Sequence, residues 1–129
     1  MLVVDLRSRV PIYEQIKNQI MELIVVGALK PHDPLPSIRA LASRLDLNFN
    51  TVKRAFSDLE TDGVVYTAVG RGTFVAEGAM DNEQIRARAA SRLREALQAA
   101  RASGLTRGDI IALAQETFLE LGKDGNDVD

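Results

Sequence analysis

The sequence is first notable for what it lacks. It contains no cysteine, no tryptophan and a single histidine in 129 residues. Without cysteine there is neither a disulfide nor a thiolate zinc site, and one imidazole cannot form a metal cluster. A cysteine nucleophile, a second histidine for acid–base chemistry and a glycine-rich nucleotide loop are also missing, which argues against an enzyme. We therefore expect no metal, no cofactor and no catalytic residues.

Long apolar runs are missing as well. No segment approaches the roughly 18 to 20 apolar residues that cross a bilayer. The first residues, MLVVDLRSRV, lack the basic-then-apolar order of a signal peptide. We expect a cytoplasmic protein that does not contact a membrane.

An excess of positive charge is absent too, since the formal net charge is −2. Residues 1–78 carry nine Lys and Arg against nine Asp and Glu, and residues 79–129 carry seven against nine. Overall charge therefore gives no support to nucleic-acid binding. A basic face can still neutralise phosphates locally while distant carboxylates point to solvent.

Helical periodicity dominates the first half. Apolar residues at steps of three and four predict a helix over residues 11–26, ended by Gly27. The next segment, LKPHDPLPS, holds three prolines and is expected to be a stiff connector. Ser37 and Asn48 are good N-caps for two short amphipathic helices that end near Leu45 and Asp62. Two such helices joined by a tight turn are typical of a helix-turn-helix.

Two β-prone runs follow the second short helix. VVYTAV and TFVA are separated by Gly70-Arg71-Gly72, which predicts a β-hairpin. A hairpin in this place is a wing. The expected fold is thus mainly α with a small β-hairpin: a winged helix-turn-helix over residues 1–78, a two-helix region over residues 79–123 and a frayed tail over residues 124–129.

The two-helix region needs a partner. One long helix is expected to end at Gly104, and Thr106 with Asp109 resembles a capping box that opens the last helix. Two amphipathic helices have too little opposing surface to bury both apolar faces, so we expect a two-fold dimer. The alternative is that this region packs back on its own winged domain. The expected interface residues are Ile85, Ala89, Leu93, Ala96, Ala100, Ile110, Leu113 and Phe118.

Several separated motifs together resemble one family. PIYEQI, LKPHDPLPSIRALASRL, NTVKRAFSDLETDGVV and GRGTFV look like the DNA-binding domain of the GntR family of bacterial regulators, over about residues 9–76. The short two-helix tail and Asn-x-Asn-Thr-Val are similar to the YtrA subfamily. The resemblance implies a dimeric repressor that binds double-stranded DNA, often at a transporter operon, and dimerises through its helical tail.

The chain departs from the family pattern at two positions. His32 stands where the family usually has glycine, and we expect a turn that does not need a positive φ there. Phe49 stands where the subfamily usually has proline, which leaves an aromatic side chain at the opening of the recognition helix.

The second helix of a helix-turn-helix enters the major groove with its N-terminal residues toward base edges. The DNA contacts are therefore expected at Asn48, Phe49, Asn50, Thr51, Lys53 and Arg54. Asn50 could pair with adenine, and Lys53 or Arg54 could contact guanine or phosphate. In the plainer interpretation Asn48 is only a cap and Arg54 part of a solvated face.

Contacts outside the recognition helix follow from the same resemblance. Ser37 can offer its hydroxyl and a helix N-terminus to phosphate, and the family uses the arginine at the position of Arg39 at DNA. In the wing, Arg71, Gly72 and Thr73 are candidates, because glycines let the backbone approach DNA and an arginine can enter the minor groove.

The sequence therefore predicts a sequence-specific DNA-binding regulator, a dimeric repressor at an inverted-repeat operator. The alternative is a winged-helix module that binds proteins without DNA specificity, since this fold also hosts such roles. A small-molecule effector of unknown identity could bind at the dimer interface.

Overall fold

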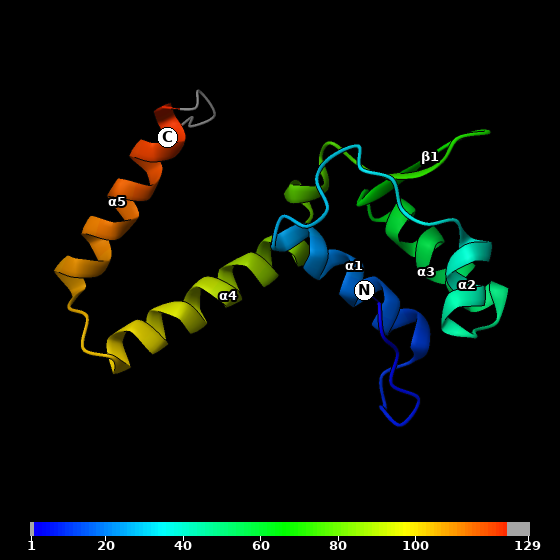
Figure 1. The fold of residues 1–129 in the computed structure, drawn as a ribbon, viewed down its shortest axis with the longest axis horizontal. Coiled ribbons are helices and arrows are strands. Elements are labelled where there is room, and N and C mark those ends of the chain that lie inside the picture. Colours follow the sequence, from blue (N-terminus) through cyan, green and yellow to red (C-terminus); the bar gives the residue numbers. More distant parts are fainter. Residues whose placement is uncertain (1, 124–129) are drawn as a thin grey trace. The chain divides into compact units, whose positions relative to one another are not determined.

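The computed structural model describes residues 2–123, so the expected frayed tail at residues 124–129 lies outside the described residues. The chain forms five helices and one hairpin within that range (Figure 1). Their bounds are α1 Ile12–Val25, α2 Ile38–Leu45, α3 Phe49–Thr61, β1 Val65–Ala68, β2 Gly72–Val75, a short 3₁₀ turn η1 Ala79–Asp81, α4 Glu83–Ala102 and α5 Arg107–Lys123. The predicted fold class is confirmed: a winged helix-turn-helix is followed by two C-terminal helices.

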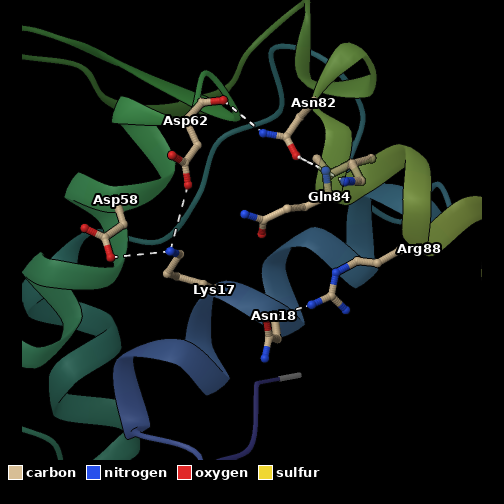
Figure 2. Close-up of polar contacts among 8 residues, drawn as sticks. Lys17, Asn18, Asp58, Asp62, Asn82, Gln84 and Arg88 are labelled. Atoms are coloured by element: carbon tan, nitrogen blue, oxygen red, sulfur yellow. Dashed lines mark hydrogen bonds and ion pairs between the residues drawn. The ribbon is translucent and has the colours of Figure 1, made fainter.

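The core of the first compact unit lies where α1 packs on α3. The apolar stripes predicted from helical spacing supply it, and Ile16, Val52 and Leu59 are fully buried. Lys17 of α1 is also buried, and its Nζ lies 3.4 Å from Asp58 and 3.9 Å from Asp62 of α3 (Figure 2). Both carboxylates are partly exposed, so the Lys17 ammonium has anionic partners and neither carboxylate is buried in the core.

The predicted caps define the helix-turn-helix. The Ser37 hydroxyl accepts a hydrogen bond from the Ala40 amide at 3.0 Å, and the Asn48 side-chain oxygen accepts one from the Asn50 amide at 2.7 Å. Asp46 ends α2 in the left-handed region at φ 56°. One residue of this conformation reverses the chain between α2 and α3, which fixes the tight turn.

The wing is an antiparallel pair in which Val65 faces Val75 and Ala68 faces Gly72. The proline-rich connector runs along its second strand: the Leu35 amide donates to the Thr73 carbonyl at 2.8 Å. Such bonds pair the backbone groups of β2 on the edge that does not face β1. The connector therefore holds the wing against the helical core.

His32 differs from expectation. Its φ is +71°, so the expectation of a turn without positive φ is wrong. The His32 Nδ1 lies within hydrogen-bond distance of the Tyr66 hydroxyl, at 2.9 Å, and the Tyr66 ring stacks on Phe74. These contacts offset the strain that a side chain meets in this region, where glycine is the usual residue.

The first unit extends further than predicted. It ends at Ala89, not at residue 78, because the first turns of α4 belong to it. Ile85 is fully buried in its core, and Arg88 donates a hydrogen bond to the Asn18 side-chain oxygen of α1 at 2.6 Å. Asn82 donates to the Asp62 carbonyl at 3.0 Å and accepts from the Gln84 amide (Figure 2). The expectation that Ile85 lies at a dimer interface is therefore wrong.

Replacing Ile85 by alanine should destabilise the winged unit. A fully buried aliphatic side chain leaves a cavity when truncated, which typically costs about 2 to 5 kcal/mol. Thermal denaturation of the variant should show a clearly lowered Tm, with the association of chains unchanged at temperatures where it is folded. A variant with an unchanged Tm but weakened association would restore the interface role of Ile85.

The second compact unit begins at Ala90 and holds the rest of α4 and all of α5. Gly104, at φ +101°, ends α4 as predicted. The predicted capping box is also present: the Thr106 amide donates to Asp109 at 2.9 Å, and the Asp109 amide donates to the Thr106 hydroxyl at 3.1 Å. Local sequence thus sets both ends of the turn between the two helices.

The capping box makes the start of α5 sensitive to acid. Hydrogen bonds from the Thr106 backbone and then its side chain hold the pKa of Asp109 below its ordinary value. A lowered folded pKa stabilises the fold above the unfolded pKa, and this contribution is lost as the pH falls through the folded pKa. An NMR titration should place the Asp109 midpoint below that of a free aspartate, and Thr106→Ala should raise it partway. A midpoint at the ordinary value would contradict the capping box.

Candidate nucleic-acid interface

The helix α3 divides cleanly into two faces. Val52, Ala55, Phe56 and Leu59 are buried, as their spacing predicts. The opposite face exposes side chains that can bind DNA. The exposed candidates are Phe49, Asn50, Lys53 and Arg54, with Thr51 half-buried beside them. A helix with one face in the core and a polar, cationic outer face has the layout of a recognition helix.

Asn48 and Asn50 have different roles at the start of this helix. The Asn48 side-chain oxygen is occupied by the cap bond to the Asn50 amide, as the plainer interpretation held. The Asn50 side chain itself is exposed on the outer face. Its amide group can both donate and accept, which is the pattern that pairs with adenine in the major groove.

Arg54 is tied to α1. Its guanidinium carbon lies 3.7 Å from the centre of the Tyr13 ring, within the range of a cation–π contact. The residues are 41 positions apart, so no local sequence signal could have shown this contact. Because the stack holds the guanidinium near α1, Arg54 suits a fixed phosphate contact better than a reach into the groove.

Arg39 lies beside the start of the recognition helix. Its guanidinium carbon is 5.9 Å from the centre of the Phe49 ring, and both residues are exposed. Ser37, two residues earlier, is the exposed N-cap of α2. Two candidate DNA residues from different helices, Arg39 and Phe49, are thus brought together on one surface.

The wing carries the remaining candidates. Arg71 is exposed at the hairpin tip, its amide donates to the Ala68 carbonyl at 2.9 Å, and Gly72 follows it at φ +117°. Thr73, in β2, is half-buried, and its carbonyl bonds to the connector. Val69 is 98% exposed at the same tip.

Among residues 90–121, whose burial is described, no side chain is buried. Leu93, Leu113 and Phe118 are each more than half exposed, while Ala100 and Ile110 are half-buried. A groove of about 290 Å³ between α4 and α5 is lined by apolar side chains, among them Leu93, Ala96 and Leu113. Ala89 is half-buried at the end of the first unit.

Other kinds of site have no support in the described range. Residues 2–123 contain no cluster of three or more side chains suited to hold a metal ion. None of the helices in this range combines the length and hydropathy that a membrane span requires. The fold and the cationic outer surface of α2, α3 and the wing define a winged helix-turn-helix protein of the DNA-binding class.

Comparison with known proteins agrees with this class. Residues 12–75 match the model of "Bacterial regulatory proteins, gntR family". The chain is 48% identical over 79 residues to the HTH-type transcriptional repressor YtrA of Bacillus subtilis, covering 61% of each chain. The solved YtrA of Sulfolobus acidocaldarius, a GntR-family transcription factor, is 40% identical over 78% of this chain and 97% of its own, with a TM-score of 0.57.

A DNA-bound structure is also similar. The DNA-binding domain of AraR in complex with operator ORX1 is 31% identical, covers 58% of this chain and 93% of its own, and has a TM-score of 0.52. The chain belongs to the GntR family of bacterial regulatory proteins, and its likeness to the YtrA proteins confirms the predicted resemblance. The match spans 61% of the length of the Bacillus subtilis repressor.

Proposed function

We propose that this chain is a sequence-specific DNA-binding transcriptional regulator, acting in the cytoplasm as a dimeric repressor at an inverted-repeat operator. One observation carries the proposal: Asn50 and Lys53 are exposed on α3, and Arg39 of α2 is exposed beside Phe49 at the start of the same helix. These are an amide that can pair with a base and two cations, on a fold similar to that of the AraR DNA-binding domain solved in complex with an operator. The relatives are transcriptional regulators, which supports a binding rather than a catalytic role.

Each element has a distinct part in this binding. The N-terminal half of α3 lies in the major groove, where Asn50 reads adenine and Lys53 contacts guanine or phosphate. Ser37 and the N-terminus of α2 meet the phosphate backbone, and Arg54 adds a phosphate contact from its stack on Tyr13. Arg71 at the wing tip enters the neighbouring minor groove.

Dimerisation occurs through α4 beyond Ala90 and through α5. This unit leaves Leu93, Leu113 and Phe118 each more than half exposed, and grouped apolar side chains on a surface are typical of an interaction site. A second copy buries it, and Ala96 and Ala100 let the helices approach closely. Two-fold symmetry then places two winged units on an inverted repeat. Binding of a small-molecule effector stays a prediction.

Selection from a pool of random duplexes tests the proposal. The full chain is incubated with the pool at fixed salt and with non-specific competitor, because affinities for DNA depend steeply on both. Bound duplexes are then sequenced. Recovery of an inverted repeat is expected. Failure to enrich any sequence would contradict the proposal and favour a module that binds proteins.

A further inference from the structure

We propose that Phe49 and Arg39 form one recognition unit that reads a thymine methyl and a nearby guanine in each operator half-site. The inference rests on the proposed function and names what this part of its site recognises. It starts from an aromatic side chain that packs into no core: Phe49 is 43% exposed, whereas Phe56 of the same helix is buried.

The helix start that carries the ring is held by its N-cap. Phe49 is the first residue of α3, directly after the N-cap Asn48, whose side chain bonds the Asn50 amide at 2.7 Å. The capped first turn holds the backbone of Phe49 in place. This end of a recognition helix meets base edges. The ring therefore lies where the major groove is expected, with polar Asn50 beside it.

The chemical groups in the major groove determine which base the Phe49 ring can contact. Among the four bases, only thymine presents an apolar group in the major groove, its C5-methyl. A phenyl ring cannot pair with the donors and acceptors of the other base edges. Its burial against a methyl group is favourable, and burial against polar edges leaves them unsatisfied.

Arg39 completes the unit. Its guanidinium carbon lies 5.9 Å from the ring centre, so the ring face attracts the cation. A guanidinium held near an aromatic ring keeps its planar N–H donors available for the two acceptors of guanine. Because successive base pairs rise by about 3.4 Å, the two side chains reach bases no more than two steps apart. The half-site should hold a thymine and a guanine at that spacing, on either strand.

Base analogues test the proposal on the selected operator. Each thymine is replaced in turn by deoxyuridine, which deletes only the methyl, and each guanine by 7-deazaguanine, which deletes one acceptor. Affinities are measured for the wild type, Phe49→Ala and Arg39→Ala. Arg44→Ala, an exposed arginine at the other end of α2, is the matched control. Circular dichroism confirms that each variant is folded.

One thymine per half-site should be sensitive. Losing its methyl should weaken binding by the wild type and Arg44→Ala by about fourfold, the equivalent of one buried carbon group. Phe49→Ala should be insensitive at that position. A guanine within two steps should be sensitive in the wild type and insensitive in Arg39→Ala.

Three results would overturn the inference while leaving DNA binding intact. They are a wild type insensitive to every deoxyuridine, a Phe49→Ala variant that keeps the sensitivity of the wild type, and sensitive bases more than two steps apart. A wild type that selects no duplex would instead contradict the proposed function itself. The two failures are therefore distinguishable.

Discussion

Arg39→Ala and Lys53→Ala will each weaken binding to the selected operator by about 1 to 3 kcal/mol, which is roughly 5- to 150-fold in Kd. Both side chains are exposed, so their removal should delete the proposed DNA contacts without opening the core. The measurement is an equilibrium titration of labelled duplex at several salt concentrations.

The salt dependence separates the two kinds of contact. A lost phosphate contact lowers the slope of log K against log salt by about one and weakens all sequences alike. A lost base contact relaxes the preference at one position. Arg44→Ala is the control of equal charge, and its affinity should stay close to that of the wild type. Normal affinity in both Arg39→Ala and Lys53→Ala at physiological salt would contradict the proposed DNA contacts of these two residues.

Leu93→Asp will convert the proposed dimer to monomers. Leu93 is 60% exposed in the single chain and lines the apolar groove between α4 and α5. A carboxylate buried there without a partner should cost about 3 to 5 kcal/mol of association free energy, which is a hundredfold or more in the dimer dissociation constant. Sedimentation velocity over a concentration series measures the shift.

A matched variant isolates the position from the charge. Gln98→Asp introduces the same carboxylate at an exposed site of α4 that does not line the groove, and it should leave the dimer unchanged. An intact dimer in Leu93→Asp would show that the interface does not include Leu93. Reduced association in both variants would indicate a charge effect on the helix as a whole.

The elements of the winged unit could be predicted because their signals are local. Ser37 and Asn48 are N-caps that mark the starts of two helices. Val52, Phe56 and Leu59 repeat at helical spacing, and Gly70, with a positive φ, lies in the turn of the wing. Each signal acts within a few residues, which is the range over which propensity and capping determine structure.

Long-range contacts could not be predicted in this way. The pairing of Arg54 with Tyr13 and that of His32 with Tyr66 join residues more than 30 positions apart. The side chains of Gln15 and Gln19 bond the backbone of the N-terminal segment at Asp5 and Val3, and no periodicity marks such contacts. Tertiary contacts of this kind depend on the folded arrangement alone.

Ile85 shows where periodicity misleads. It shares one helical stripe with Leu93, so the sequence predicts one interface for both. The structure divides α4 between two units, and Ile85 is buried in the first while Leu93 is exposed in the second. A stripe shows which face of a helix is apolar and does not show what covers that face.

The stoichiometry on the selected operator tests the central claim most directly. The chain is titrated onto a labelled inverted repeat and onto a single half-site, and both are followed by sedimentation. Two chains on the inverted repeat, and a clearly weaker complex on the half-site, are the predicted result. Equal affinity for both duplexes, or one chain on the inverted repeat, would contradict a dimeric regulator that reads a two-fold operator.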